Sequence, residues 1–194
     1  MTSKFFAFLD RMKLIDRWAL MRNTTKEDVA QHTMQVAMIA HALCVIENTL
    51  YGGKYDADRA AVIALYHESA EVVTGDLPTP VKYYDDNINK AYKNIEARAE
   101  EKLLGTLPDE LKGAFAPLVS PDKKSHEYRL VKCADKLCAL IKCVEELAVN
   151  NNEFKNAYEA TEKILRSAPE KSVKYFLDVF IPAYSMSLDY LLDS

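Results

Sequence analysis

Apolar residues recur every three to four positions along nearly the whole chain, and this spacing predicts a succession of amphipathic helices. Thr25 and Asp28 have the spacing of a capping box, Asp56 can cap the next helix, and Pro182 interrupts the last one. The expected helices cover residues 3–15, 24–50, 56–73, 87–107, 108–118, 125–150, 153–167 and 169–192. Without a repeat or a flexible linker, the pattern predicts one all-α domain over residues 1–194.

Two segments depart from the helical pattern. Residues 15–23 read "IDRWALMRN", and residues 74–84 read "TGDLPTPVKYY", in which Pro78 and Pro80 prevent a continuous helix. Loops held between rigid helices commonly carry binding and catalytic residues. We therefore expect functional residues in these two segments.

The composition narrows the class of protein. The 194 residues are 49% hydrophobic and 28% charged, as in soluble globular proteins, and only five glycines make an all-β fold improbable. A net charge of −4 argues against non-specific binding to nucleic acid or membranes. No apolar run approaches the length of a transmembrane helix, and the N-terminal stretch carries acids and lacks a signal-peptide cleavage site.

The cysteines indicate a reducing compartment. None forms a C-x-x-C pair, and all lie among apolar residues in predicted helices, so we expect reduced core thiols and a cytoplasmic protein. They are Cys44, Cys133, Cys138 and Cys143.

The dipeptide His67-Glu68 is the first candidate for chemistry, although such a pair alone is weak evidence. The chain has four histidines, and a second one, His126, is also followed by an acid, Glu127. In a continuous helix, His67 and Glu71 would share one face, and Glu68 would lie about 100° around it. This arrangement predicts a polar, acidic patch on that helix.

Two distant residues could complete a metal site. His32 has apolar neighbours on its predicted helix face, and Asp135 is surrounded by apolar residues. Taken singly, His32 is more often a hydrogen-bonded core histidine and Asp135 a helix-pairing acid. Together with His67 and Glu68 they form a set of two nitrogen and two oxygen donors, which suits a divalent transition metal.

The order His … His-acid … Asp resembles the HD-domain phosphohydrolases, which are all-α proteins. The likeness is closest to the YfbR type of bacterial 5′-deoxynucleotidase, and the block "TGDLPTPVKY" is its most specific segment. The resemblance implies that one divalent cation, Co, Mn, Zn or Mg, is held by four residues. These are His32, His67, Glu68 and Asp135.

The resemblance also implies roles in binding and catalysis. Arg17 would orient the phosphate with its planar guanidinium, Trp18 would meet the nucleotide, and Glu71 would act as general acid or base. On their own, Arg17 could form a surface ion pair with Asp16 or Asp10. Trp18 could be a core residue, and Glu71 could be a solvated helix residue.

The second loop is expected to contact the substrate as well. Asp76 would accept a hydrogen bond from the sugar 3′-hydroxyl, although Gly-Asp is also ordinary turn chemistry. The implied substrate contacts of this loop are Asp76, Leu77, Pro78 and Thr79, and the ligands Glu68 and Asp135 would contact the substrate too.

Glu68 departs from the superfamily pattern, which has aspartate at this position. Glutamate offers the same oxygen donor on a side chain that is one methylene longer. To coordinate the metal, this longer side chain requires that the helix shift away, that the side chain adopt a bent rotamer, or that a water molecule bridge the carboxylate and the metal. The departure bears on metal affinity, metal preference and activity.

The resemblance therefore implies a homodimeric, metal-dependent hydrolase of deoxyribonucleoside 5′-monophosphates, and the unpaired cysteines favour a cytoplasmic location. One alternative is a compact deoxynucleoside triphosphohydrolase, for which Arg22 and Lys82 could supply further positive charge. Others are a catalytically silent nucleotide-binding protein, because of Glu68, and an all-α interaction protein with purely structural polar residues.

Overall fold

The computed structural model describes residues 2–82 and 84–192, and its described part contains helices but no strands. A single β-bridge joins Asp16 to Asp28. The predicted all-α class is confirmed. The helices are α1 (Phe5–Leu9), η1 (Asp10–Leu14), α2 (Val29–Leu50), α3 (Ala57–Tyr66), α4 (Glu71–Thr74), α5 (Thr79–Lys82), α6 (Asp86–Leu104), α7 (Asp109–Val119), α8 (His126–Ala148), η2 (Asn152–Phe154), α9 (Lys155–Arg166), α10 (Lys171–Val179), η3 (Ile181–Ser185) and α11 (Leu188–Leu192).

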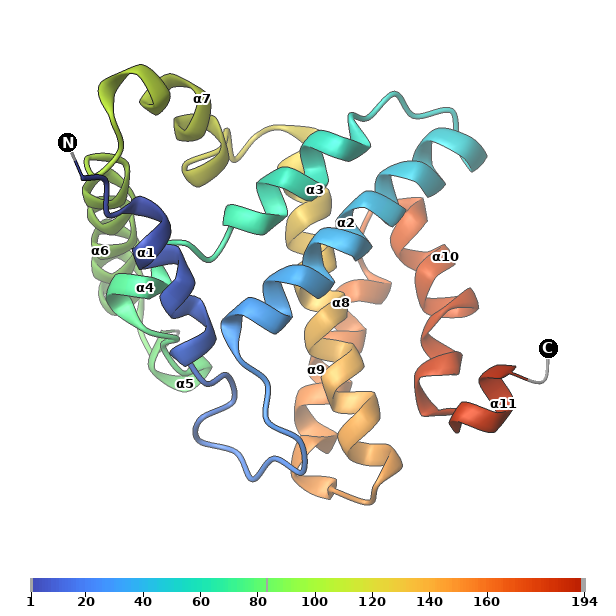
Figure 1. The fold of residues 1–194 in the computed structure, drawn as a ribbon. Coiled ribbons are helices and arrows are strands. Elements are labelled where there is room, and N and C mark those ends of the chain that lie inside the picture. The colour runs from blue at the N-terminus through green and yellow to red at the C-terminus, as the bar shows by residue number, and fades with distance from the viewer. Residues whose placement is uncertain (1, 83, 193–194) are drawn as a thin grey trace.

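The main core lies between α2, α3 and α8, with α9 and α10 packed along one side (Figure 1). Ala60 and Ala64 are fully buried, and such small residues let α3 approach its neighbours closely. Leu43 of α2 and Leu137 of α8 are also fully buried. The core therefore fixes the relative positions of three helices.

Helix α2 is long and apolar enough to cross a membrane by length and composition alone. Here it is a core helix. Val36, Ala40 and Leu43 pack in the main core, and the helix also carries the buried polar residues His32 and Glu47.

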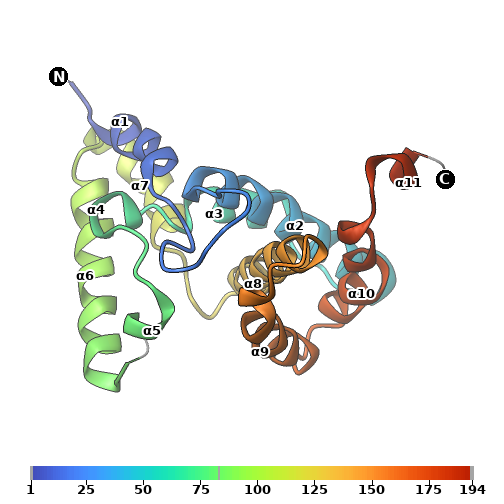
Figure 2. The same cartoon turned by 90° about the horizontal axis from the view of Figure 1, so that it is seen from below.

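A second apolar cluster joins α1, α6 and α7, which Figure 2 shows on the opposite side of α3 from α10. Its buried members are Phe5, Leu103, Leu107 and Val119. Tyr66, which ends α3, and Val72 of α4 pack against this cluster, whereas Ala64 of α3 belongs to the main core. The last turn of α3 thus passes from the main core to the second cluster.

The start of α2 differs from the prediction. The capping box is formed by Asp28 and Gln31, whose side chains bond each other's backbone N–H, and not by Thr25 with Asp28. The backbone N–H groups of Thr24 and Thr25 donate to Glu146 of α8 instead. This attachment keeps the segment before Asp28 out of the helix.

The helix expected over residues 56–73 begins as predicted, with Asp56 capping the N–H of Arg59, but it ends at Tyr66. The next residues form tight turns, in which the N–H of Glu71 donates to the carbonyl of Glu68 at 3.0 Å. His67 and Glu71 therefore do not share one helix face, and that prediction is wrong. His67 and Glu68 project from the turn between α3 and α4.

The two predicted loops are non-helical as expected, apart from one turn. Residues 15–28 form a loop whose arms are joined by Val29 N–H to Ile15 carbonyl and by Arg17 N–H to Glu27 carbonyl, at 3.0 and 2.9 Å. Gly75 ends α4 with a φ of +69°, and Pro80 lies in the short helix α5.

Two further predictions, the interruption at Pro182 and the unpaired cysteines, agree with the structure. Pro182 is the second residue of η3, which follows α10 in place of a continued helix, as the predicted interruption requires. All four cysteines are free, and three of them are buried: Cys44, Cys138 and Cys143.

Candidate active site

Four side chains from separate parts of the fold bring one donor atom each to a single point. These atoms all lie within 4.8 Å of one another. The Nε2 of His32 is 3.1 Å from Oδ1 of Asp135, and the Nε2 of His67 is 3.2 Å from Oε1 of Glu68. His32 comes from α2, Asp135 from α8, and the other two from the turn after α3. We call these four residues the HHED cluster.

The orientation of both histidine rings suits metal binding. The Nδ1 of His67 lies 2.6 Å from the carbonyl of Ala64, which can only accept, so this nitrogen carries the proton. The Nδ1 of His32 lies 3.3 Å from Oε1 of Glu27. The ring of His67 is thereby held with its Nε2 lone pair toward the cluster, and the ring of His32 lies with Nδ1 toward Glu27 and Nε2 toward Asp135, as metal-ligating histidines do beside an outer carboxylate.

The spacing of the donor atoms also fits one cation. Two ligands bound at ~2.1 Å to one tetrahedral ion lie about 3.4 Å apart. The two separations of 3.1 Å and 3.2 Å are close to this value, and small side-chain movements would bring all four donors, which lie within 4.8 Å of one another, to one ion. The Nε2 of His67 is buried and has no hydrogen-bond partner among the described residues. The HHED cluster therefore fits a divalent cation.

Glu68 reaches the cluster despite its additional methylene. It lies in a turn and not within a regular helix, so its direction is not fixed by the path of α3. Its carboxylate is largely buried and faces His67.

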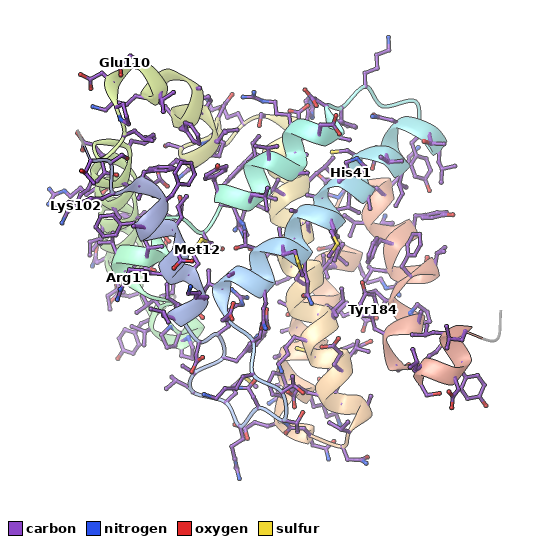
Figure 3. The ribbon with its side chains drawn as sticks, in the orientation of Figure 1. Arg11, Met12, His41, Lys102, Glu110 and Tyr184 are labelled. Carbon is purple, nitrogen blue, oxygen red and sulfur yellow. The ribbon has the colours of Figure 1, made fainter. Side chains whose placement is uncertain are left out.

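The other two histidines lie elsewhere. His41, labelled in Figure 3, is half exposed further along α2, with its Nε2 3.7 Å from Asp58. His126 begins α8 and packs against Tyr55. The His126-Glu127 pair is thus distinct from the HHED cluster.

Glu27 is a site residue that the sequence analysis missed. Its carboxylate faces His32, accepts from Nε1 of Trp18 at 3.0 Å, and lies 3.2 Å from Nε of Arg17. It lies five residues before His32, in a segment that the sequence analysis assigned to a helix, and no motif marks it.

Arg17 is buried, with 12% of its side chain exposed, and is not a surface ion pair. Asp16 pairs with Lys26 and Asp10 with Lys13 instead. Burial alone would lower the pKa of Arg17, but the carboxylates of Glu27 and Asp135 raise it above its usual value. Arg17 is therefore a fixed cation beside the HHED cluster.

Trp18 adopts a backbone conformation that non-glycine residues rarely occupy, with φ at +58°. Its ring packs against Phe154, with ring centroids 5.4 Å apart. Such a conformation costs about 1–3 kcal/mol and persists only where surrounding contacts hold it. The indole is thus held in place beside Arg17 and is not an ordinary core side chain.

Lys132 is a second residue that sequence reasoning missed. Its Nζ lies 2.7 Å from Oδ2 of Asp135, one helical turn away, and its side chain is 42% exposed. Burial raises the pKa of Asp135, but Lys132 and His32 together hold that pKa well below its usual value. The second oxygen of Asp135 is thereby positioned by a cation.

Glu71 is buried in α4, and its Oε2 has no hydrogen-bond partner among the described residues. Burial, followed by the nearby carboxylates of Glu68 and Asp76, raises the pKa of Glu71 to about 10. It is not a solvated helix glutamate.

Asp76 lies in the same electrostatic environment. Burial raises its pKa, as does Glu68, whereas Arg17 acts in the opposite direction. Leu77 and Pro78 are partly buried beside it, and the side chain of Thr79 lies outside the described part of the structure.

The two basic residues considered for a triphosphate are engaged elsewhere. The Nε of Arg22 donates to Glu153 at 2.9 Å on the surface. Lys82 pairs with Glu96 of α6 at 3.2 Å.

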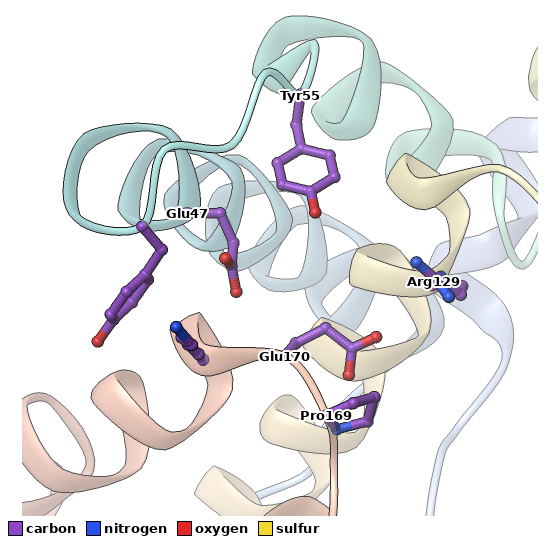
Figure 4. A pocket seen from close by; sticks show the side chains of 7 residues that line it. Glu47, Tyr55, Arg129, Pro169 and Glu170 are labelled. Carbon is purple, nitrogen blue, oxygen red and sulfur yellow. The ribbon is translucent and has the colours of Figure 1, made fainter.

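A separate cavity of about 260 Å³ opens at the other end of α2 (Figure 4). Glu47, fifteen residues after His32, lies on its wall, which places it ~22 Å from the HHED cluster along the helix axis. The cavity is lined by Glu47, Tyr51, Tyr55, Arg129, Pro169, Glu170 and Lys171.

Sequence comparison relates the chain to one family along most of its length. Residues 4–184 match the family "5′-deoxynucleotidase YfbR-like". The chain is 50% identical over 188 residues to a 5′-deoxynucleotidase of Citrobacter koseri and to 5′-deoxynucleotidase YfbR of Escherichia coli O127:H6. Each alignment covers 96% of this chain and 94% of the relative.

Solved structures share the fold. An HD-domain phosphohydrolase from Listeria innocua superposes with a TM-score of 0.82 at 23% identity, covering 93% of this chain and 88% of that one. A cyanophage S-2L HD phosphohydrolase, DatZ, solved with dA and one catalytic Zn²⁺ ion, gives a TM-score of 0.62 at 19% identity, covering 94% and 98%. These likenesses confirm the HD-domain fold.

Proposed function

The chain belongs to the YfbR-like 5′-deoxynucleotidase family, and from this premise we propose that it hydrolyses deoxyribonucleoside 5′-monophosphates with the help of one divalent cation. It is a phosphoric monoester hydrolase that yields a deoxyribonucleoside and inorganic phosphate. We further infer a single domain over residues 1–194, a cytoplasmic location and a homodimer, as the family resemblance implies.

The HHED cluster would hold the cation, and Co²⁺, Mn²⁺, Zn²⁺ and Mg²⁺ are the candidates. The donor set of two imidazoles and two carboxylates favours a transition metal, and a neighbour of the same fold was solved with zinc. When bound, the cation supplies Lewis acidity at the phosphate and an activated water.

Arg17 is assigned to the phosphate. Its Nε faces Glu27, so the terminal nitrogens of the guanidinium are the groups that would donate to phosphate oxygens. Because Glu27 also faces His32, one carboxylate orients both the phosphate-binding cation and a metal ligand. Lys132 would add positive charge on the other side of Asp135.

Glu71 is assigned to proton transfer. Water adds to phosphorus, and the bond from phosphorus to the 5′ oxygen breaks. Glu71 gives its proton to the departing 5′ oxygen and takes one from the attacking water, so it ends in its starting state. Its burial and its raised pKa support this role.

Trp18 and the loop from Asp76 to Thr79 are assigned to the sugar. Asp76 would accept a hydrogen bond from the 3′-hydroxyl, with Leu77 and Pro78 packing beside it. A fixed indole leaves no room for a 2′-hydroxyl, which would exclude ribonucleotides by steric conflict. Arg22 and Lys82, the two basic residues that a triphosphate could use, each pair with a glutamate, Glu153 and Glu96.

The convergence of four donors beside a buried arginine carries this proposal. Phosphate release from dAMP, AMP and dATP, measured with each of the four cations, tests it. We expect dAMP to be hydrolysed at least about tenfold faster than AMP, since small steric differences give discrimination of this order. Equal rates on dAMP and AMP would indicate a general nucleotidase. Triphosphate release from dATP would indicate the triphosphohydrolase, and no release from any substrate the silent binding protein.

A further inference from the structure

A buried carboxylate ties the 15–28 loop to the far end of α8. Figure 1 shows this loop running down to the turn that joins α8 to α9. Glu146, 1% exposed, accepts from the Thr24 N–H at 3.1 Å and from the Thr24 hydroxyl at 2.8 Å. It also accepts from Thr25 N–H at 3.4 Å and from Nδ2 of Asn151 at 2.8 Å.

A lysine completes the arrangement. Lys142, with 6% of its side chain exposed, donates to Glu146 and to the carbonyl of Thr25. Asn151 also donates to the carbonyl of Arg22 at 2.7 Å. Two buried charges are costly unless partners satisfy them, and here most of the partners belong to the loop.

The same end of α8 supports the indole of Trp18. Phe154, which packs against that ring, lies three residues after Asn151 in the turn that follows α8. The loop is therefore attached to this end of α8 through Glu146 at Thr24 and Thr25, through Asn151 at Arg22, and through Phe154 at Trp18. At the Phe154 contact the backbone of Trp18 has a positive φ.

We propose that Glu146 is a positioning residue, which holds the 15–28 loop so that Arg17 and Trp18 face the nucleotide. The proposal rests on the proposed function, because it takes these two residues to contact the substrate. Glu146 belongs to neither apolar cluster, and its hydrogen-bond partners do not either. Its replacement therefore weakens the attachment of the loop at Thr24 and Thr25, leaves the contacts of Asn151 and Phe154 in place, and removes no apolar core side chain.

Glu146→Gln is the direct test. The amide has a single oxygen acceptor, so it cannot accept all the hydrogen bonds that the carboxylate receives from the loop N–H groups and from the ammonium of Lys142. Glu145→Gln is the matched control, since Glu145 is the adjacent residue on α8 and is exposed. For Glu146→Gln we expect kcat/KM on dAMP to fall about 10–100-fold, the usual effect of a small displacement of a substrate-positioning group. The preference for dAMP over AMP should fall with it, while the bound cation per chain stays unchanged.

Trp18 is the only tryptophan, so its fluorescence reports on the loop without any substrate. We expect Glu146→Gln to shift the emission to longer wavelength and to increase quenching by acrylamide, and Glu145→Gln to match the wild type. If the wild type released no phosphate but Glu146→Gln still changed the fluorescence of Trp18, the positioning role would stand and the proposed function would fall. Thr24→Val, which deletes only the hydroxyl donor, provides a milder variant should Glu146→Gln not fold. The proposal would be overturned if the variant that folds, Glu146→Gln or Thr24→Val, kept both the Trp18 emission and the preference for dAMP over AMP of the wild type.

Discussion

At the scale of single residues, Glu27 shows how the site is organised. One carboxylate faces a candidate metal ligand, His32, and both members of the Arg17-Trp18 pair. A change at Glu27 would therefore disturb three functional side chains at once. Sequence reasoning passed over it because an acid in a polar segment is unremarkable, and because only the folded loop brings it back toward His32.

Glu68 gives the first prediction. Glu68→Asp should keep kcat/KM on dAMP within about tenfold of the wild type, which corresponds to roughly 1.4 kcal/mol of barrier. Both side chains are carboxylates, and the turn after α3 can adjust to the loss of one methylene. Steady-state kinetics with a saturating cation provides the measurement. A wild type without activity and an active Glu68→Asp variant would show instead that this chain has lost the chemistry.

At the scale of elements, the sequence predicted where most helices lie, since their apolar spacing is regular and Asp56, Gly75 and Pro182 mark boundaries. It did not predict the break at Tyr66. The segment "HESAEVV" contains no proline or glycine, and only packing shows the change of direction. The proximity of His67 to His32 and Asp135 was expected from the family pattern, whereas helical spacing gave a wrong relation between His67 and Glu71.

Gly75 gives the prediction for the second loop. Its φ of +69° is strained for any side chain, although an added Cβ would meet no atom within 4 Å. Gly75→Ala should therefore lower the free energy of unfolding by roughly 1 kcal/mol through backbone strain. It should also lower kcat/KM on dAMP about fivefold or more, because Asp76 follows directly and displaced positioning groups are costly.

Gly52 is the matched control, with a φ of +73° and no atom within 4 Å of an added Cβ, in the connection between α2 and α3. Gly52→Ala should lose similar stability and keep full activity. An equal loss of activity in both variants would assign the effect at Gly75 to general destabilisation and not to the loop.

At the scale of the whole molecule, the candidate site lies where the two apolar clusters meet. His32 and Asp135 come from α2 and α8 of the main core, whereas the turn with His67 and Glu68 lies between Tyr66 and Val72, which pack on the second cluster. The all-α class followed from the apolar spacing. The division into two clusters did not, because it depends on which helix faces meet in space.

The stability of the whole chain should depend on pH through Glu146. Burial alone would raise its pKa, but hydrogen bonds from Lys142, Asn151 and Thr24 lower that pKa to about 2, from 4.5. A carboxyl whose pKa is depressed by folding stabilises the folded state above pH ~4.5, and this contribution is lost as the pH falls toward 2. The difference in unfolding free energy between wild type and Glu146→Gln should therefore shrink by about 2 kcal/mol between pH 7 and pH 3. Urea unfolding of the metal-free proteins measures it, and a difference that stays constant over this range would contradict the assignment.

Phosphate release from dAMP by protein stripped of metal, with one cation added back in small steps, tests the central claim most directly. The HHED cluster has four donors for one ion, so activity should be absent at first, rise in proportion to the added cation, and level off at one equivalent per chain. Asp135→Ala, which removes one donor, should stay inactive at one equivalent. Full activity in the stripped wild type, or equal restoration of Asp135→Ala, would contradict a cation held by His32, His67, Glu68 and Asp135.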